Sequence, residues 1–141
     1  MPEFEKFSVS QVGILIRDNK CLILQFAKSP DKWGLPGGRA DRGENKQEAF
    51  ARELKEELGF DNFVSYDVVD YDFFYFGIEK KSVCGIAQYI KNDLDEIVLS
   101  EEHLSYKWIT EEEIDDYKYF WNTMSRILKN GFKYHKRLKN Q

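Results

Sequence analysis

The sequence predicts an α/β fold in a single domain that spans all 141 residues. Segments rich in β-branched and aromatic residues lie before and after one stretch with helical periodicity, and a second helical stretch closes the chain. Hydrophobic residues make up 42% of the chain and aromatic residues 16%, which is ordinary for a folded protein with one core. We therefore expect a β-sheet that packs against helices.

Two segments typical of β-strands open the chain, Ser8–Arg17 and Lys20–Ala27. Asp18 and Asn19 between them are residues that favour a tight turn, so the pair is expected to form a hairpin. The centre of each segment is a nearly continuous run of hydrophobic residues, as in strands that are covered on both faces.

A loop at Lys28–Lys32 leads into a glycine-rich turn that ends at Gly38. Pro36 cannot continue a strand ladder, and glycines here permit unusual backbone angles and a close approach of other groups. Trp33, at the start of the turn, either packs in the core, which we prefer, or stacks on a base of a substrate.

The next stretch is expected to form a helix from about Lys46 to Leu58. Phe50, Leu54 and Leu58 recur every four residues and make one apolar stripe. Gly59 stands where a C-terminal cap glycine would stand.

Glu53, Glu56 and Glu57 share one face of this helix because of their spacing. Three like charges packed in this way repel one another, and a bound cation would remove the repulsion. Carboxylate oxygens are the ligands that Mg²⁺ prefers. A solvated acidic face is the alternative interpretation.

Three further strands are expected after this helix, at Phe63–Val69, Tyr71–Phe76 and Ser82–Lys91, with a turn at Glu79–Lys81. Gly85 in the last of them is interpreted as a bulge. The dense aromatic residues of the second strand either pack the sheet against helices or, because side chains alternate, present one set to a pocket.

An acidic loop, Asn92–His103, precedes a short strand at Tyr106–Ile109. Thr110 and Glu113 have the spacing of a capping box, which predicts a short helix that runs to about residue 117. A second helix is expected at Phe120–Lys129.

Gly131 is expected to end that second helix, whose inward-facing residues would be Phe120, Met124, Ile127 and Leu128. From Arg126 to Gln141 the charged residues are basic, with no acid opposing them in the sequence. This stretch is interpreted as a solubilising helix end and tail. An anion-steering patch or a weak RNA contact are the alternatives.

The overall charge and hydropathy exclude some classes of function. A net charge of −4 argues against a general nucleic-acid surface, and no run of eighteen apolar residues could span a membrane. The first residues lack the apolar segment of a signal peptide. Cys21 and Cys84 are interpreted as buried thiols in a reducing cytoplasm, with a disulfide as the alternative. We therefore expect a cytoplasmic protein.

One sequence motif indicates function far more specifically than the composition and charge do. Gly38, Glu44, Arg52-Glu53-Leu54, Glu56-Glu57 and Gly59 resemble the signature of the Nudix hydrolases, G-x5-E-x7-R-E-U-x-E-E-x-G-U, in which U is a bulky aliphatic residue. All seven fixed positions match. The last U position holds Phe60, which stays apolar, so we expect altered packing there and unchanged chemistry.

The resemblance implies a Nudix-type α/β/α sandwich, with a mixed sheet between helices, and a Mg²⁺ site in which Mn²⁺ is an alternative. It implies roles for residues of the signature. Glu53, Glu56 and Glu57 would be metal ligands, together with the backbone carbonyl of Gly37. Arg52 and Glu44 would belong to the catalytic group by holding these acids in place, while Gly38 and Gly59 would be structural.

The family often takes a further glutamate from a loop before a strand that contains tryptophan. Here the resemblance points to Glu102, or its neighbour Glu101, as a metal ligand or general base, with a solvated loop as the alternative. His103 is interpreted as structural. Trp33, Tyr75 and Arg39 are the residues we expect to bind substrate.

The expected function is metal-dependent hydrolysis of the diphosphate linkage in a nucleoside diphosphate joined to another moiety. Such a substrate could be a nucleoside triphosphate, a nucleotide sugar or a dinucleoside polyphosphate. The alternatives are a nucleotide-sensing module without hydrolysis and a hydrolase of the RNA-decapping type. The expected partner is a small nucleotide-type substrate, with nucleic acid and membrane disfavoured, and the chain would act as a monomer or homodimer.

Overall fold

The protein is described by a computed structural model for residues 3–76 and 80–141. Seven strands form a sheet in which the order is β3-β2-β1-β6-β5, while β4 pairs with β1 and β7 pairs with β2. Strands β1 and β6 run parallel and the other pairs are antiparallel, so the sheet is mixed. The strands are β1 (Ser8–Arg17), β2 (Lys20–Phe26), β3 (Trp33–Gly34), β4 (Gly37–Arg39), β5 (Val64–Phe76), β6 (Lys81–Lys91) and β7 (His103–Ile109).

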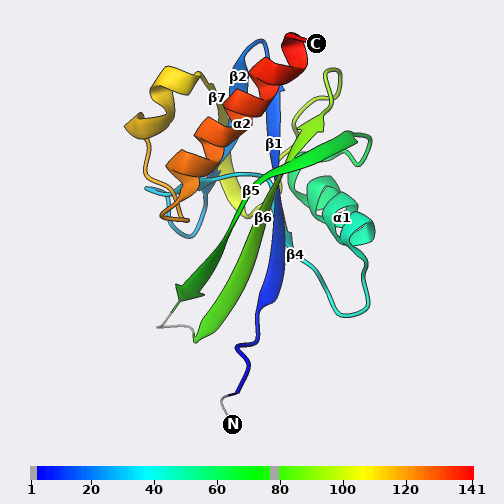
Figure 1. Ribbon diagram of the computed structural model, residues 1–141, viewed down its shortest axis with the longest axis vertical. Helices are drawn as coiled ribbons and strands as arrows, with labels where there is room; N and C mark the ends of the chain where they lie inside the picture. The colour runs from blue at the N-terminus through cyan, green and yellow to red at the C-terminus, as the bar shows by residue number, and fades with distance from the viewer. Residues whose placement is uncertain (1–2, 77–79) are drawn as a thin grey trace.

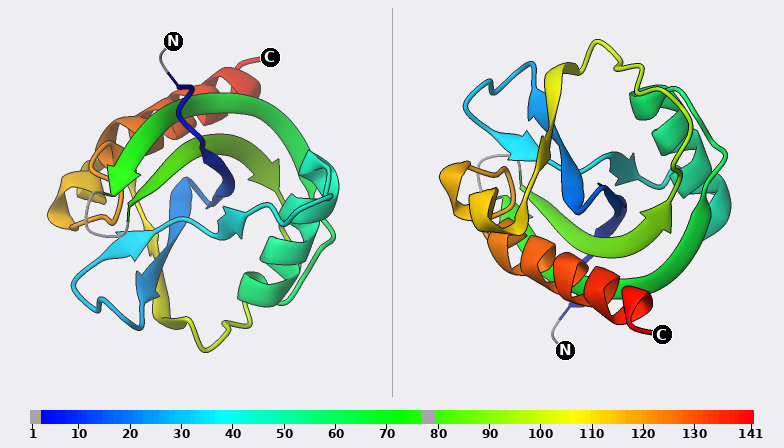
Figure 2. Two further views of the ribbon diagram at one scale, coloured as in Figure 1. Left: turned by 90° about the horizontal axis from the view of Figure 1, so that it is seen from below. Right: turned by 90° about the horizontal axis from the view of Figure 1, so that it is seen from above.

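Two helices cover the sheet on opposite sides, α1 (Lys46–Leu58) and α2 (Met124–Lys139), and the end-on views show the sheet between them (Figures 1 and 2). Strand β1 contributes side chains to the hydrophobic cores on both faces of the sheet. Ile14 and Ile16 pack in the core under α2, while Leu15 points to the core under α1 with Phe50 and Leu54. This confirms the expected α/β fold with a mixed sheet between helices.

The β1–β2 hairpin is confirmed, and its turn residues Asp18 and Asn19 both have positive φ, at 50° and 61°. Two successive residues with positive φ match the right-handed twist of the flanking strands, and Asp and Asn tolerate this conformation better than most residues. The hairpin therefore follows from local sequence.

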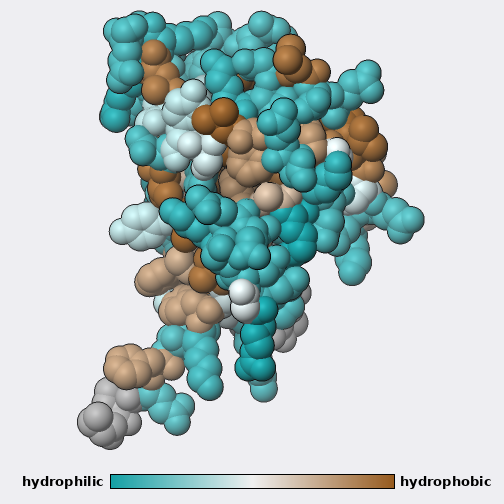
Figure 3. All heavy atoms as spheres, turned by 90° about the vertical axis from the view of Figure 1, so that its right-hand side faces the viewer, coloured by the Kyte–Doolittle hydropathy of each residue, from teal (hydrophilic) through white to brown (hydrophobic). Residues whose placement is uncertain are grey.

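The predicted bounds of α1 are confirmed. Asn45 caps its N-terminus, since its side chain accepts a hydrogen bond from Glu48 N at 2.9 Å. At the other end Gly59 has a φ of 85°, and its N–H donates to Lys55 O at 3.1 Å. The exposed side of α1 is largely hydrophilic, with separate hydrophobic patches around it (Figure 3).

Strand β5 differs from the prediction because it is one continuous strand rather than two. Its irregularities lie between Ser65 and Asp70, whereas the register at Gly85 on β6 is regular. Gly85 is therefore not a bulge. A Cβ at Gly85 would lie 2.5 Å from the ring of Trp121, so glycine makes room for that ring. The turn expected at Glu79–Lys81 lies partly outside the described residues, and β6 begins at Lys81.

Strand β7 begins at His103, three residues earlier than expected, because this part pairs with β2. The predicted capping box is confirmed, with Thr110 N donating to Glu113 Oε1 at 2.9 Å. The helix that follows is a 3₁₀ helix, η1 (Glu111–Asp116).

The second helix was predicted wrongly at both ends. Helix α2 begins at Met124, so Phe120 lies in the preceding loop, and Gly131 is inside the helix. A Cβ at Gly131 would lie 2.6 Å from Cδ1 of Ile14, which shows that the glycine permits close packing of α2 on β1. A glycine needed for packing has the same appearance in sequence as a glycine that ends a helix.

The basic C-terminal stretch forms most of α2 and is not a tail. Acids from other elements oppose its charges, which the sequence alone did not reveal. Arg126 Nε lies 3.0 Å from Asp70 Oδ2, and Lys129 Nζ lies 3.0 Å from Asp115 Oδ2. Lys136 pairs with Glu111 in the same way.

Cys21 is buried and Cys84 is half-buried, and both are free thiols. Burial raises the pKa of the Cys21 thiol to about 12, so it stays protonated. Within the described ranges, no helix is long and apolar enough to cross a membrane.

Candidate active site

One cavity of about 480 Å³ lies beside the glycine-rich turn and is lined by a cluster of acids and a cluster of apolar side chains, which we call its acidic end and its apolar end. Its acidic end is lined by Asp41, Glu53, Glu56, Glu57 and Glu102. Its apolar end is lined by Phe26, Phe76, Phe120, Trp121 and Met124. The volume is in the range of small-molecule sites.

The acids come together from two parts of the chain. Glu53, Glu56 and Glu57 share one face of α1, as their spacing predicted, and Glu102 joins them from the turn before β7. The charges of Glu53 and Glu102 both act to raise the pKa of Glu57, which indicates that the three carboxylates lie near one another. The structure thus brings Glu102 to the predicted acidic face.

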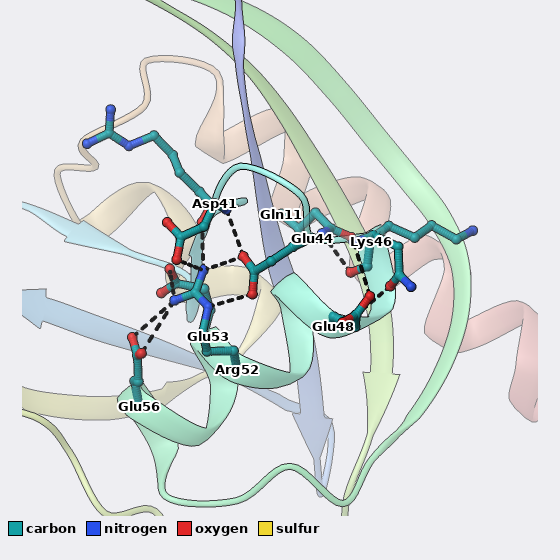
Figure 4. A network of polar contacts seen from close by, with 10 residues as sticks. Gln11, Asp41, Glu44, Lys46, Glu48, Arg52, Glu53 and Glu56 are labelled. Atoms are coloured by element: carbon teal, nitrogen blue, oxygen red, sulfur yellow. Dashed lines mark hydrogen bonds and ion pairs between the residues drawn. The ribbon is translucent and has the colours of Figure 1, made fainter.

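Arg52 lies among four carboxylates, those of Asp41, Glu44, Glu53 and Glu56 (Figure 4). Its Nε donates to Glu44 Oε2 at 2.8 Å, and its Nη1 donates to Glu53 Oε1 at 3.1 Å. Weaker contacts reach Glu56 Oε1 at 3.4 Å and Asp41 Oδ2 at 3.3 Å. One guanidinium therefore fixes several carboxylates, as its five donors in a rigid plane allow.

Glu44 joins the loop after β4 to α1. Besides its bonds to Arg52, it accepts a hydrogen bond from Asp41 N at 2.7 Å. These two donors lower the pKa of Glu44 to about 2, so it is ionised at neutral pH.

The pKa values of Glu57 and Glu53 are shifted in the opposite direction, upward. Glu57 is only 6% exposed, and burial raises its pKa to about 8 although Gly37 N donates to its Oε2 at 2.7 Å. Burial also raises the pKa of Glu53. Groups with raised pKa beside a cleft are typical of functional sites.

Glycine is required at the two positions Gly37 and Gly38 for different structural reasons. A Cβ at Gly38 would lie 2.4 Å from the carboxylate of Glu53, and so would push that side chain away. Gly37 has a φ of 144°, and a Cβ there would lie 1.9 Å from Gln11 O. Glycine at both positions lets β4 approach the acids and β1 closely.

The donor set fits a hard divalent cation, because carboxylates from α1 and from the turn before β7 line one cavity and burial raises the pKa of two of them. Among the described residues, no group of three or more acids, histidines or cysteines is placed so that it could hold a metal ion without a change of side-chain orientation. Their oxygens are directed instead at Arg52 and at Gly37 N.

Three of the predicted site residues lie elsewhere. Trp33 is buried in the core, which is the preferred of its two interpretations. Tyr75 faces away from the cavity and contacts Phe7, because alternate side chains of β5 point to opposite faces. Glu101 is exposed and does not line the cavity, whereas Glu102 and Arg39 do.

His103 is buried against Phe26, with ring centroids 5.3 Å apart, and does not line the cavity. Its Nδ1 is one of two buried side-chain atoms in the described residues without a hydrogen-bond partner. This position agrees with the structural interpretation.

The sequence allowed one set of the aromatic residues of β5 to face a pocket, as Phe76 does, but it did not single out the other rings at the apolar end. Phe76 could have been found, because it alternates with Tyr75 on a strand and so had to face the opposite side. Phe120 was placed inside a helix, and only the tertiary fold brings its loop to the cavity.

Comparison with known proteins supports this description. A family model described as the NUDIX domain matches residues 8–131. An 8-oxo-dGTP diphosphatase from Buchnera aphidicola is 31% identical over 122 residues, which cover 82% of this chain and 84% of that protein. An RNA pyrophosphohydrolase from Ruthia magnifica is 28% identical over 133 residues, which cover 84% and 72% respectively.

Solved structures share the fold. The MutT protein from Methanosarcina mazei superposes with a TM-score of 0.79 at 24% identity, covering 96% of this chain and 99% of that one. The dihydroneopterin triphosphate pyrophosphohydrolase from E. coli gives a TM-score of 0.73 at 20% identity, covering 89% and 96%. With the complete signature from Gly38 to Phe60 and the matched domain over most of its length, the chain belongs to the Nudix family of hydrolases.

Proposed function

We propose that the protein hydrolyses the diphosphate linkage of a nucleoside diphosphate joined to a further group, with a divalent metal ion as cofactor. The observation that carries the proposal is the position of four glutamates, Glu53, Glu56, Glu57 and Glu102, at one end of a cavity whose other end is aromatic. Negative charge there suits a cation that neutralises a diphosphate, and rings suit a base. The relatives named for 8-oxo-dGTP and RNA support the same class of reaction.

In this proposal Glu53, Glu56 and Glu57 hold Mg²⁺, with Mn²⁺ as an alternative, and the carbonyl of Gly37 assists them. When bound, such an ion would supply positive charge to the diphosphate and lower the pKa of the attacking water. Arg52 and Glu44 keep the glutamates in position without touching the substrate. Arg39, which lines the same cavity, holds a phosphate oxygen.

Glu102 acts as the general base. As it takes a proton from water, the water oxygen forms a bond to one phosphorus, and the bond from that phosphorus to the bridging oxygen breaks. The bridging oxygen leaves with the bonding electrons on the second phosphate. The products are a nucleoside monophosphate and a phosphorylated remainder, which is pyrophosphate when the substrate is a triphosphate.

The free thiols of Cys21 and Cys84 support a reducing compartment, and we propose the cytoplasm. An RNA-directed activity has less support from this structure, because several basic residues of α2 on which it would depend are paired with acids of the same chain.

The test is product release from a panel of nucleoside triphosphates, oxidised dGTP, ADP-ribose, nucleotide sugars, dinucleoside polyphosphates and capped RNA. Each is measured with Mg²⁺, with Mn²⁺ and with chelator. Glu56→Gln should lose activity, and the matched control Glu112→Gln, an exposed acid outside the cavity, should keep it. Full turnover in Glu56→Gln contradicts the proposal. Tight metal-dependent binding without turnover would favour a nucleotide sensor.

A further inference from the structure

The apolar end of the cavity contains a wall of three phenylalanine rings. The ring centroid of Phe120 lies 5.4 Å from that of Phe26 and 5.5 Å from that of Phe76. Phe120 remains 45% exposed although it lines the cavity. The wall therefore supports Phe120 from two sides and leaves part of its ring open to a ligand.

The loop that carries Phe120 is fixed to the sheet by its backbone. Trp33 N donates to Lys118 O at 2.9 Å, and Phe120 N donates to Trp33 O at 3.0 Å. These two bonds flank Tyr119, which forms a parallel bridge with Trp33. Because Trp33 is itself buried, the backbone that carries Phe120 is held in place before any ligand arrives, and the contacts with Phe26 and Phe76 support its ring.

We propose that Phe120 is the surface on which the base of the substrate stacks, and that stacking is the main means of base recognition, so that the enzyme accepts all common bases with similar efficiency. This inference rests on the proposed function and adds to it a statement of which bases the enzyme accepts. Stacking on an aromatic side chain tolerates any base because every base has a π-face.

The polar residues of the cavity do not favour a hydrogen-bonded readout of a base edge. Among the described residues that line it, none is an asparagine or glutamine, the side chains that offer a donor and an acceptor together. Asp41 is engaged with Arg52. Ser10 lies between Arg39 of β4 and Gly85 of β6, and its hydroxyl, which both donates and accepts, would bind an edge of any base without selecting one of them.

Lys81 is the cation that borders the aromatic end, since it pairs with Phe76 across β5 and β6. A lysine ammonium group only donates, and it does so from a flexible stem. Acceptor atoms occur on all common bases, so a contact from Lys81 would add affinity without selecting one of them.

The size of the expected selectivity separates the two modes of recognition. A site built to hydrogen-bond a substrate group rejects an analogue that lacks it by roughly 10⁴-fold or more, whereas an apolar pocket discriminates by at most about 100-fold. A stacking site should therefore show a spread of less than about 100-fold among bases.

The first experiment is titration calorimetry with non-hydrolysable α,β-methylene triphosphates of adenosine, guanosine, cytidine and uridine in the presence of Ca²⁺. Dissociation constants within about 100-fold of one another are expected. A larger preference for one base, or no binding of any of the four, overturns the inference. Because these probes do not react, the result is independent of whether hydrolysis occurs, which the product assay decides separately.

The second experiment tests Phe120 itself. Phe120→Ala should weaken binding of all four analogues by a similar factor, about tenfold, while binding of inorganic tripolyphosphate stays unchanged. Phe120→Trp should restore the affinity. The control Tyr71→Ala removes an exposed ring of β5 that does not line the cavity and should change neither.

Three results of the second experiment contradict the inference. They are an unchanged affinity in Phe120→Ala, a loss confined to one base, and an equal loss for tripolyphosphate, which would mean that the ring only maintains the structure. A thermal melt of each variant confirms that it is folded, which is expected because Phe120 is half exposed.

Discussion

Arg52 and Glu44 form a two-pronged ion pair, with Nε 2.8 Å from Oε2 and Nη2 2.9 Å from Oε1. The pair joins the loop after β4 to the middle of α1, and the same guanidinium reaches Glu53. Planar bidentate geometry of this kind needs the guanidinium fork, which a lysine cannot provide. The orientation of Glu53 therefore depends on a residue outside its own helix.

We predict that Arg52→Lys retains the charge but loses the fork, so that Glu53 is less well oriented. Loss of a group that positions a metal ligand typically costs 10- to 100-fold in activity or metal affinity, and we expect a decrease of about that size in kcat. Steady-state kinetics at saturating Mg²⁺ and a Mg²⁺ titration measure it. Arg42→Lys, an exposed arginine in the same loop, is the matched control. Equal kinetics for the two variants would show that the fork has no role.

Gly38→Ala is expected to impair activity more than stability, whereas Gly37→Ala is expected to impair stability. At Gly38 the new methyl group meets the end of the flexible Glu53 side chain, which can move at little cost, so we expect a small change in unfolding free energy and at least a tenfold loss of kcat. At Gly37 the methyl group meets backbone of β1 at a positive φ, and we expect a loss of at least about 2 kcal/mol in stability. Denaturant unfolding and kinetics on both variants test this. A strongly destabilised Gly38→Ala would contradict it.

The raised pKa of Glu57 predicts that the stability of the metal-free protein depends on pH. Burial raises its pKa from 4.5 to about 8, so between these values the folded state binds more protons than the unfolded state. By linkage, this residue causes stability to fall as pH rises through that window, with the lower value fully reached above pH 8. Metal binding to the ionised form should oppose the fall.

Thermal melts from pH 5 to 9 in chelator, and again in Mg²⁺, measure this effect. Glu57→Gln carries no titrating group, so the difference between the wild-type and variant curves isolates the contribution of this residue. If the difference does not change with pH, Glu57 is ionised throughout and the account of its burial is wrong.

The two neighbouring acids before β7 should differ in importance. Glu102 lines the cavity and Glu101 does not, so Glu102→Gln should reduce kcat by roughly 10²-fold or more, the size expected for a general base. The loss should be at least about tenfold greater than that for Glu101→Gln. Comparable losses would mean that the loop rearranges when substrate binds.

Much of the fold and the acidic end of the site could be predicted because their causes are local. The capped helix, the positive-φ turn at Asp18-Asn19 and the spacing of Glu53, Glu56 and Glu57 are all read from residues near one another in the chain. The spacing of the signature also indicated Arg52, whose partners lie within or just before the same helix.

The rest depends on contacts between distant segments. Gly85 and Gly131 were interpreted as a bulge and a helix end, because the sequence did not show that Trp121 and Ile14 would fill the space beside them. Phe120 was missed for the same reason, since its neighbours Phe26 and Phe76 come from other strands.

The variant Gly131→Ala distinguishes a local effect, helix propensity, from a tertiary one, the packing of α2 on β1. In an isolated helix the change would stabilise by about 1 kcal/mol, but here the new methyl group would lie 2.6 Å from fully buried Ile14. Overpacking of this kind costs roughly 1–3 kcal/mol, so we expect a net loss of about 1 kcal/mol. The double variant with Ile14→Val should be more stable than the sum of the single effects. A stabilised Gly131→Ala would show that α2 can shift away from β1.

The bonds between Trp33 and the loop around Phe120 have a consequence for how this protein could change over evolution. The acids that we propose to carry out hydrolysis are mostly on α1, whereas the open ring stands on a separate loop whose backbone is hydrogen-bonded to Trp33 of the sheet. Backbone bonds do not depend on which side chains the loop carries. Substitutions in this loop could therefore give descendants of this chain new substrate preferences, while α1 and the reaction it supports are inherited unchanged.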